Sequence, residues 1–214
     1  MMQVGILGSG DAGLRLGDGF IETGNIVRIG TRSPPKVHSW ISKYGNSKAS
    51  SGNFAEAAAF GELLVIATLW EGAAAAIRSA GPKNFAGKVV IDVTNPLDFS
   101  KGMPPRLAVG HTDSGGETIQ RLLPDAKVVK AFNIVGNTHM FRPEFPGGPP
   151  TMFICGNDEE AKQTVSKILA SFGWDADDIG GIEGSRLLEP LAMLWITHYF
   201  RTNNGQHAFK LLRK

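Results

Sequence analysis

Residues 4–13 read Val4-Gly5-Ile6-Leu7-Gly8-Ser9-Gly10-Asp11-Ala12-Gly13, an apolar run that ends in glycines spaced G-x-G-x-x-G. Gly8 permits a tight turn after a strand, Gly10 leaves room for a pyrophosphate beside the backbone, and Gly13 lets the following helix pack closely on the strand. The first N–H groups of that helix and its positive dipole end favour phosphate. Because a helical pattern follows at once, we interpret the stretch as a dinucleotide-binding turn rather than an ordinary glycine-rich turn.

Strand and helix patterns alternate along the rest of the chain. The expected strands cover 3–7, 26–30, a short edge strand within 47–52, 63–67, 88–92, 127–132, 151–155 and 175–181. The expected helices cover 12–23, 35–44, 54–60, 71–80, 117–123, 158–172 and 184–212, the last with a break or cap at 203–205. Residues 95–116 and the proline-rich residues 133–150 are expected to be loops. This order predicts an α/β fold, a Rossmann-like doubly wound parallel sheet with a C-terminal helical appendage.

The composition is that of an ordinary soluble protein: 214 residues, 42% hydrophobic and 20% charged, with a net charge of +2. This charge gives no reason to expect a nucleic-acid partner. Cys155 is the only cysteine, which excludes an internal disulfide and a Cys-rich metal site and fits a cytoplasmic protein. The five histidines do not fall at metal-ligand spacing, so no metal site is predicted. No apolar run approaches the ~18 residues of a membrane helix, so we expect no membrane association.

The tip of the second expected strand indicates which dinucleotide binds. NAD-preferring domains usually carry Asp or Glu there, whereas this chain reads Gly30-Thr31-Arg32-Ser33. Thr31 and Ser33 can donate hydrogen bonds to a 2′-phosphate, Arg32 can form a charge-assisted fork, and Lys36 adds charge. One such contact contributes ~1.5–3 kcal/mol, roughly a ten- to hundredfold preference. We therefore predict NADP rather than NAD; the alternative is that Arg32 is solvated surface. We expect an NADP-binding Rossmann domain over 1–180 and a C-terminal helical segment packed on it over 181–214.

Five segments together resemble a known family across nearly the whole chain. They are Gly8-Ser9-Gly10-Asp11, Gly30-Thr31-Arg32-Ser33-Pro34, Asn95-Pro96-Leu97, Lys130-Ala131-Phe132-Asn133 and Phe153-Ile154-Cys155-Gly156-Asn157-Asp158. The chain resembles the NADPH-dependent, deazaflavin-linked oxidoreductases. That family includes the coenzyme F420:NADP oxidoreductases and the cytoplasmic reductase domains of the six-transmembrane epithelial antigen of prostate metalloreductases.

The resemblance implies hydride transfer between NADP(H) and a small-molecule redox acceptor with a flavin-like ring, such as coenzyme F420, FAD or FMN. Both reacting rings then belong to cofactors, so no catalytic side chain is assigned. By position, Asn95 and Pro96 would lie near the nicotinamide, and residues 132–135 would lie where the second ring docks. The expected cofactor-binding residues are Gly8, Ser9, Gly10, Asp11, Ala12, Gly13, Thr31, Arg32, Ser33, Lys36, Ala67, Thr68, Leu69, Asn95, Pro96, Phe132, Asn133 and Ile134.

Two other functions stay open at this stage. One is a non-catalytic, redox-sensing NADP(H)-binding module, favoured by the unusual carboxylate of Asp11 in the phosphate loop, which could instead cap the first helix. The other is an NADP-dependent dehydrogenase of a small organic substrate, which would need an acid–base residue beside Asn95, and none is evident. Asn133 could also be no more than a loop-capping amide. The C-terminal helical segment is expected to form a homodimer contact.

Overall fold

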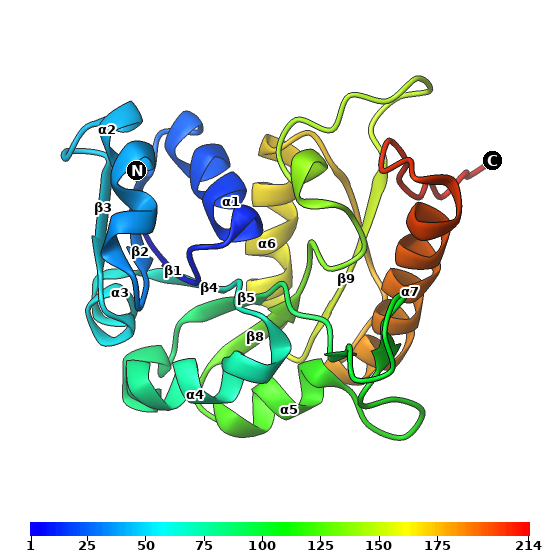
Figure 1. The fold of residues 1–214 in the computed structure, drawn as a ribbon, viewed down its shortest axis with the longest axis horizontal. Helices are drawn as coiled ribbons and strands as arrows, with labels where there is room; N and C mark the ends of the chain where they lie inside the picture. Colours follow the sequence, from blue (N-terminus) through cyan, green and yellow to red (C-terminus); the bar gives the residue numbers. More distant parts are fainter.

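The computed structural model describes residues 1–214 and contains an eight-stranded sheet with helices on both faces (Figure 1). Its strands are β1 (Gln3–Leu7), β2 (Ile26–Gly30), β3 (Ala49–Gly52), β4 (Leu63–Ile66), β5 (Val89–Asp92), β8 (Lys127–Lys130), β9 (Thr151–Gly156) and β10 (Asp175–Asp178). They lie in the order β10-β9-β8-β5-β4-β1-β2-β3. The chain therefore runs outward in one direction from β1 and in the other from β4. Ligands of such sheets bind where the strand order reverses, here between β1 and β4. The Rossmann-like doubly wound fold is confirmed.

Apolar side chains form a core on each face of this sheet. One core contains residues of α1 (Asp11–Glu22), α2 (His38–Tyr44), α6 (Glu159–Ser171) and α7 (Ser185–Thr202). The other contains residues of α3 (Phe54–Phe60), α4 (Trp70–Ala80) and α5 (Gly115–Leu122). Four 3-10 turns complete the list: η1 (Pro34–Val37), η2 (Pro82–Phe85), η3 (Asn137–His139) and η4 (Ile182–Gly184). None of the helices combines the length and the apolar character that crossing a bilayer requires.

The sheet is mostly parallel, as predicted, but its last two strands run against the other six. β9 runs antiparallel to β8, with Lys130 opposite Cys155, and β10 runs parallel to β9. A parallel neighbour needs a crossover connection, usually a helix. Residues 131–150 between β8 and β9 hold only the short turn η3, so the chain returns in the opposite direction.

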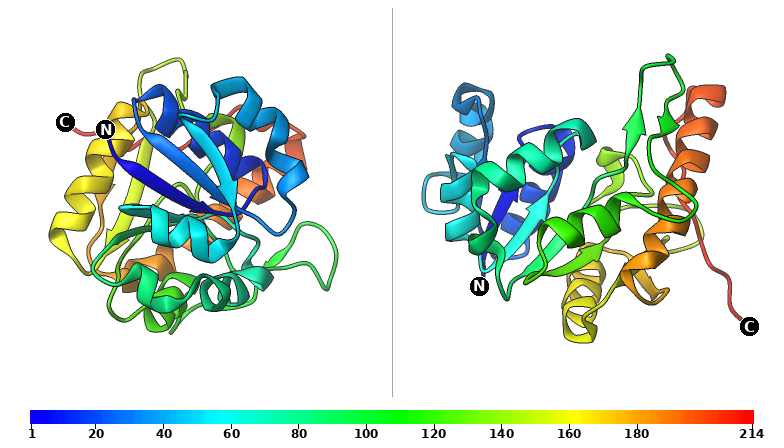
Figure 2. Two further views of the ribbon diagram at one scale, coloured as in Figure 1. Left: turned by 90° about the vertical axis from the view of Figure 1, so that its left-hand side faces the viewer. Right: turned by 90° about the horizontal axis from the view of Figure 1, so that it is seen from below.

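Three local predictions also need correction. The single helix over 35–44 is split into η1 and α2, because adjacent prolines in its first turn favour a tighter start. The strand over 127–132 ends at Lys130, and Phe132 has a φ of 62° that no strand allows. The expected loop over 95–116 contains a two-stranded hairpin of β6 (Leu97–Asp98) and β7 (Arg106–Leu107), seen beside α7 in Figure 2.

The C-terminal helix is shorter than the sequence indicated. α7 ends at Thr202, and Asn203 takes the left-handed conformation with a φ of 49°, so the predicted break at 203–205 is confirmed. Residues 203–214 form no helix, contrary to the expectation of helix up to 212. The backbone N–H of Thr151, at the start of β9, donates to the carbonyl of Phe209 at 2.8 Å. This tail is therefore held against the sheet.

Candidate functional site

The three glycines of the first loop have different surroundings. Gly8 has a φ of 127°, and a Cβ there would lie 2.3 Å from the carbonyl oxygen of Ala67. A Cβ on Gly13 would lie 2.2 Å from the carbonyl oxygen of Gly8. A Cβ on Gly10, by contrast, would meet nothing within 4 Å. The first and third glycines are therefore required by the fold, whereas the space above Gly10 is open.

The start of α1 faces the same space. Gly10 is the N-cap residue and Asp11 the first helical residue, and no side chain caps the helix. The expectation that Asp11 caps it is therefore wrong. Because the first N–H groups of a helix have no partner within it, they stay available to an anion. The exposed carboxylate of Asp11 also lies in the first turn, where the helix dipole favours negative charge.

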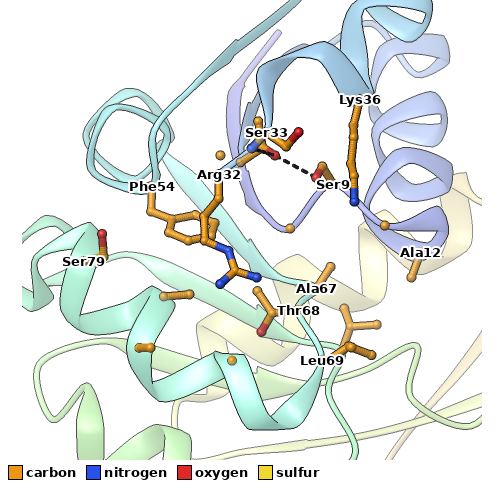
Figure 3. Close-up of a pocket in the computed structure, with 18 of the residues that line it drawn as sticks. Ser9, Ala12, Arg32, Ser33, Lys36, Phe54, Ala67, Thr68, Leu69 and Ser79 are labelled. Carbon is orange, nitrogen blue, oxygen red and sulfur yellow. Dashed lines mark hydrogen bonds between the residues drawn. The ribbon is translucent and has the colours of Figure 1, made fainter.

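Of the residues after β2, one helps to hold the loop in place, and the side chains of three others form no hydrogen bond or ion pair. Thr31 is buried; its Oγ1 lies 2.8 Å from Ser9 Oγ and accepts from the backbone N–H of Ser33 at 3.1 Å. Its hydroxyl therefore ties the glycine loop to the β2 turn, where a free phosphate donor had been expected. Arg32 and Lys36 are exposed and form no ion pair or side-chain hydrogen bond. With the Ser33 hydroxyl, they form an unneutralised cationic rim (Figure 3).

The opposite wall follows β4. Ala67, Thr68 and Leu69 come directly after this strand and line the same cavity (Figure 3). Thr68 Oγ1 is buried without a hydrogen-bond partner, and Leu69 is 78% exposed. A buried hydroxyl without a partner is unusual in a folded chain and fits a surface that a ligand covers.

These walls enclose a cavity of about 1160 Å³ at the carboxyl ends of β1, β2 and β4. It also contains residues that the sequence analysis missed: Gly30, Phe54, Glu71, Gly72, Ala75, Ala76, Ser79 and Val93. Five of them lie on α4, where small residues at 72, 75, 76 and 79 recur at helical spacing. That spacing is the signal that could have predicted this wall, since small residues on one face leave room for a ligand.

The remaining predicted residues do not line the cavity: Gly13, Asn95, Pro96, Phe132, Asn133 and Ile134. Phe132, Asn133 and Ile134 are buried, so they offer no open face on which a second ring could dock. Asn133 Nδ2 donates to Asn95 Oδ1 at 3.0 Å, and Asn95 Nδ2 donates to the carbonyl of Asn133 at 2.8 Å. This reciprocal pair joins the ends of β5 and β8. Asn133 Oδ1 stays buried without a partner.

Cys155 offers no reactive thiol to the site. Burial raises the pKa of this thiol to about 11, so the group is neutral at ordinary pH. Its sulfur lies 3.3 Å from Ser185 Oγ, inside the core. Cys155 is therefore not a nucleophile of this site.

Comparison with known proteins points in the same direction. Residues 3–96 match the family described as NADP oxidoreductase, coenzyme F420-dependent. A solved structure from Arthrobacter sp. FB24, provisionally assigned as an F420-dependent NADP reductase, has a TM-score of 0.94 and 38% identity over 100% of both chains.

Two curated relatives cover different shares of their own length. The F420-dependent NADP reductase of Methanocaldococcus jannaschii is 29% identical over 206 residues, which is 91% of each protein. Metalloreductase STEAP3 of Rattus norvegicus is 30% identical over 194 residues, 90% of this chain. The match covers only 37% of that metalloreductase.

Proposed function

Because the chain belongs to the family of coenzyme F420-dependent NADP oxidoreductases, we propose that it transfers hydride between NADP(H) and a deazaflavin or flavin ring. The cavity carries this proposal. A bare glycine loop and a helix N-terminus line one wall for a pyrophosphate, and the unpaired cations Arg32 and Lys36 offer contacts to a 2′-phosphate. The nicotinamide end of the dinucleotide would then extend toward the carboxyl ends of β4 and β5, past Thr68 and Leu69.

The protein's part in this reaction is to hold two rings face to face and to exclude water. Hydride chemistry is supplied by the nicotinamide and by the acceptor ring when both are bound. Correct orientation alone contributes several kcal/mol to such a step. The residues that orient the dinucleotide are Ser33, Arg32 and Lys36 at its phosphorylated end.

The acceptor we propose first is a deazaflavin such as coenzyme F420, with FMN or FAD as the flavin alternatives. The relative that matches this chain over 91% of its own length is an F420-dependent NADP reductase, which supports that order.

We further propose that residues 1–180 act as the NADP-binding domain and that 181–214 pack on it. A cytoplasmic location is proposed because the one cysteine is unpaired and buried, as is common in a reducing compartment.

Anaerobic mixing of the protein with NADPH and then with F420, FMN or FAD tests the proposal. The nicotinamide absorbance band is expected to decay as the acceptor is reduced, fastest with F420. Tight NADPH binding without reduction of any acceptor would contradict hydride transfer and favour the redox-sensing module.

Arg32→Ala tests the cofactor preference. We expect NADPH affinity to fall about ten- to hundredfold, because one charge-assisted contact contributes about 1.5–3 kcal/mol. NADH affinity should change less than twofold, since NADH carries no 2′-phosphate. Arg78→Ala on α4 is the matched control, because Arg78 is exposed and lies outside the cavity lining. Equal loss for both nucleotides would show that Arg32 does not select between them.

We also propose that the protein is a homodimer through α7. Leu187 and Leu194 of this helix are 69% and 59% exposed, and both lie on its outer side. Large apolar side chains grouped on one surface usually mark an interaction site.

A further inference from the structure

Three charged side chains are buried together, and two of them, Asp92 and Lys130, lie three residues before Asn95 and Asn133 in the chain. Lys130 is the last residue of β8 and is completely buried. Its Nζ lies 2.8 Å from Asp92 Oδ2 and 3.0 Å from Glu189 Oε1, and donates to the carbonyl of Thr94 at 2.7 Å. The ammonium thus donates one hydrogen bond, to the segment that follows β5, and forms ion pairs with carboxylates of β5 and α7.

This cluster is a poor way to gain stability. Each buried ion loses several kcal/mol of hydration, and well-packed apolar residues often replace a buried ion pair without loss. Burial also lowers the pKa of Lys130, but Asp92 and Glu189 outweigh this effect and hold the pKa above its ordinary value, so the ammonium stays charged. The clear consequence of the cluster is that it fixes the positions of the backbone segments around it.

Lys130 and Asp92 fix the residue that precedes Asn95. Asp92 Oδ1 accepts from the backbone N–H of Thr94 at 2.9 Å and from its hydroxyl at 2.7 Å. The carbonyl of Thr94 accepts from Lys130. Both polar backbone groups of Thr94 are therefore bound to the cluster, and the chain leaves β5 toward Asn95 and Pro96 in one defined direction.

Glu189 joins α7 and α5 to the same point. Its two carboxylate oxygens accept from the backbone N–H groups of Gly115 and Gly116 at 2.9 Å each, at the positive end of α5. A Cβ on Gly116 would lie 2.9 Å from Lys130 Cε and 2.1 Å from Ser185 Oγ, so this packing requires glycine. The carbonyl of Leu188, the neighbour of Glu189, accepts from Asn133 Nδ2 at 3.1 Å.

We propose that Lys130, Asp92 and Glu189 are positioning residues, which hold the segment Thr94-Asn95-Pro96 and α7 in the one arrangement that aligns the nicotinamide for hydride transfer. The inference rests on the proposed function, because it concerns the step in which the two rings react. None of the three side chains lines the cavity, and neither do Thr94, Asn95 and Asn133. The cluster therefore acts through Val93, which lies between Asp92 and Thr94 in the chain and lines the cavity.

Glu189→Gln and Asp92→Asn test this role from the two sides of the ammonium. Each keeps the size of the side chain but turns an amide NH2 toward a donor. We expect the dissociation constant of NADPH to stay within about threefold, because the phosphate contacts lie elsewhere in the cavity. The single-turnover rate of hydride transfer at saturating NADPH and acceptor should fall at least about tenfold, since misplacement by about 1 Å can cost a hundredfold.

Lys127→Met is the control, because Lys127 lies on the same strand but pairs with Asp158 at the surface. A wild-type transfer rate in both test variants would overturn the proposal. So would a parallel loss of NADPH affinity, an equal loss in the control, or failure of both variants to fold, because each would point to a purely structural cluster.

Bound NADPH gives a readout that does not depend on turnover. If the wild-type protein binds NADPH but reduces no acceptor, the proposed function fails by itself. The nicotinamide emission of bound NADPH then decides the positioning role. A changed emission in Glu189→Gln, with wild-type emission in Lys127→Met, would support it, and identical emission in all three proteins would overturn it.

Discussion

Among single residues, Gly10 is the one whose substitution should change NADP(H) affinity with the least effect on the free energy of unfolding. Its backbone, with φ −80° and ψ 175°, suits any residue, and the space beside it is open. Gly10→Ala should therefore change the free energy of unfolding by no more than about 1 kcal/mol, because the smaller entropy of the unfolded chain opposes the lower preference for Ala at the N-cap. NADP(H) affinity should fall about tenfold or more, because the new methyl group occupies the approach of the pyrophosphate. Calorimetric titration and urea unfolding measure the two quantities.

Gly110→Ala is the control, since a Cβ there also meets nothing within 4 Å and Gly110 lies outside this cavity. Unchanged affinity in Gly10→Ala would mean that no phosphate approaches this loop. Gly8→Ala and Gly13→Ala, by contrast, should lose stability, because their methyl groups would overlap backbone atoms.

Residue positions were predictable where a local rule decides them. The glycine loop and Arg32 follow from backbone conformation and charge at a fixed spacing. The cluster of Asp92, Lys130 and Glu189 was missed because its partners come from distant segments. Asp92 ends the apolar strand β5, and Lys130 follows the two buried valines of β8. Two opposite charges in such positions could have indicated a buried pair. The contact of Glu189 with α5 depends on tertiary packing alone.

Among the helices, α3 is defined by a capping box at its start. Asn53 Oδ1 accepts from the backbone N–H of Glu56 at 2.9 Å, and Glu56 Oε2 accepts from that of Asn53 at 2.8 Å. Asn53→Ala should lower the free energy of unfolding by about 1 kcal/mol, because it leaves helix N–H groups unpaired. Urea unfolding measures the loss. Asn46→Ala, at an exposed position before β3, should stay within about 0.5 kcal/mol of the wild type.

The same helix begins with Phe54, whose ring lies in the cavity wall (Figure 3). Asn53 itself does not line the cavity, so the NADP(H) affinity of folded Asn53→Ala should change only slightly. A large loss of affinity at full folding would mean that α3 is coupled to the nucleotide, and an unchanged unfolding energy would show that the cap contributes nothing.

The sequence predicted which segments are helices and which are strands, but it did not predict the direction in which the last strands run in the sheet. Apolar periodicity and capping residues locate most helices and strands to within a residue or two, because both are local signals. The reversal of β9 depends on the path of residues 131–150, which no periodicity encodes. The end of α7 at Thr202 depends on the left-handed Asn203 and on the tail contacts with Thr151. Those contacts override the helical pattern of residues 203–212.

At the scale of the whole molecule, α7 and the hairpin beside it both carry exposed apolar groups. Besides Leu187 and Leu194, α7 exposes part of Phe200, and the hairpin beside α7 exposes Phe99 and Met103. The buried side of α7 packs on the sheet through Leu188 and Ala192, and Leu187 and Leu194 stay exposed. A two-fold contact would bring this stripe against its own copy.

Leu194→Glu tests this assembly. The wild-type protein should sediment with twice the chain mass of 22.9 kDa, and the variant with the single mass. A two-fold axis near Leu194 places two carboxylates in one apolar contact, where neither has a counter-ion. Leu212→Glu is the control, because Leu212 is 85% exposed on the C-terminal tail. A wild-type protein that sediments as a monomer at all concentrations, or a control that dissociates equally, would remove α7 as the dimer contact.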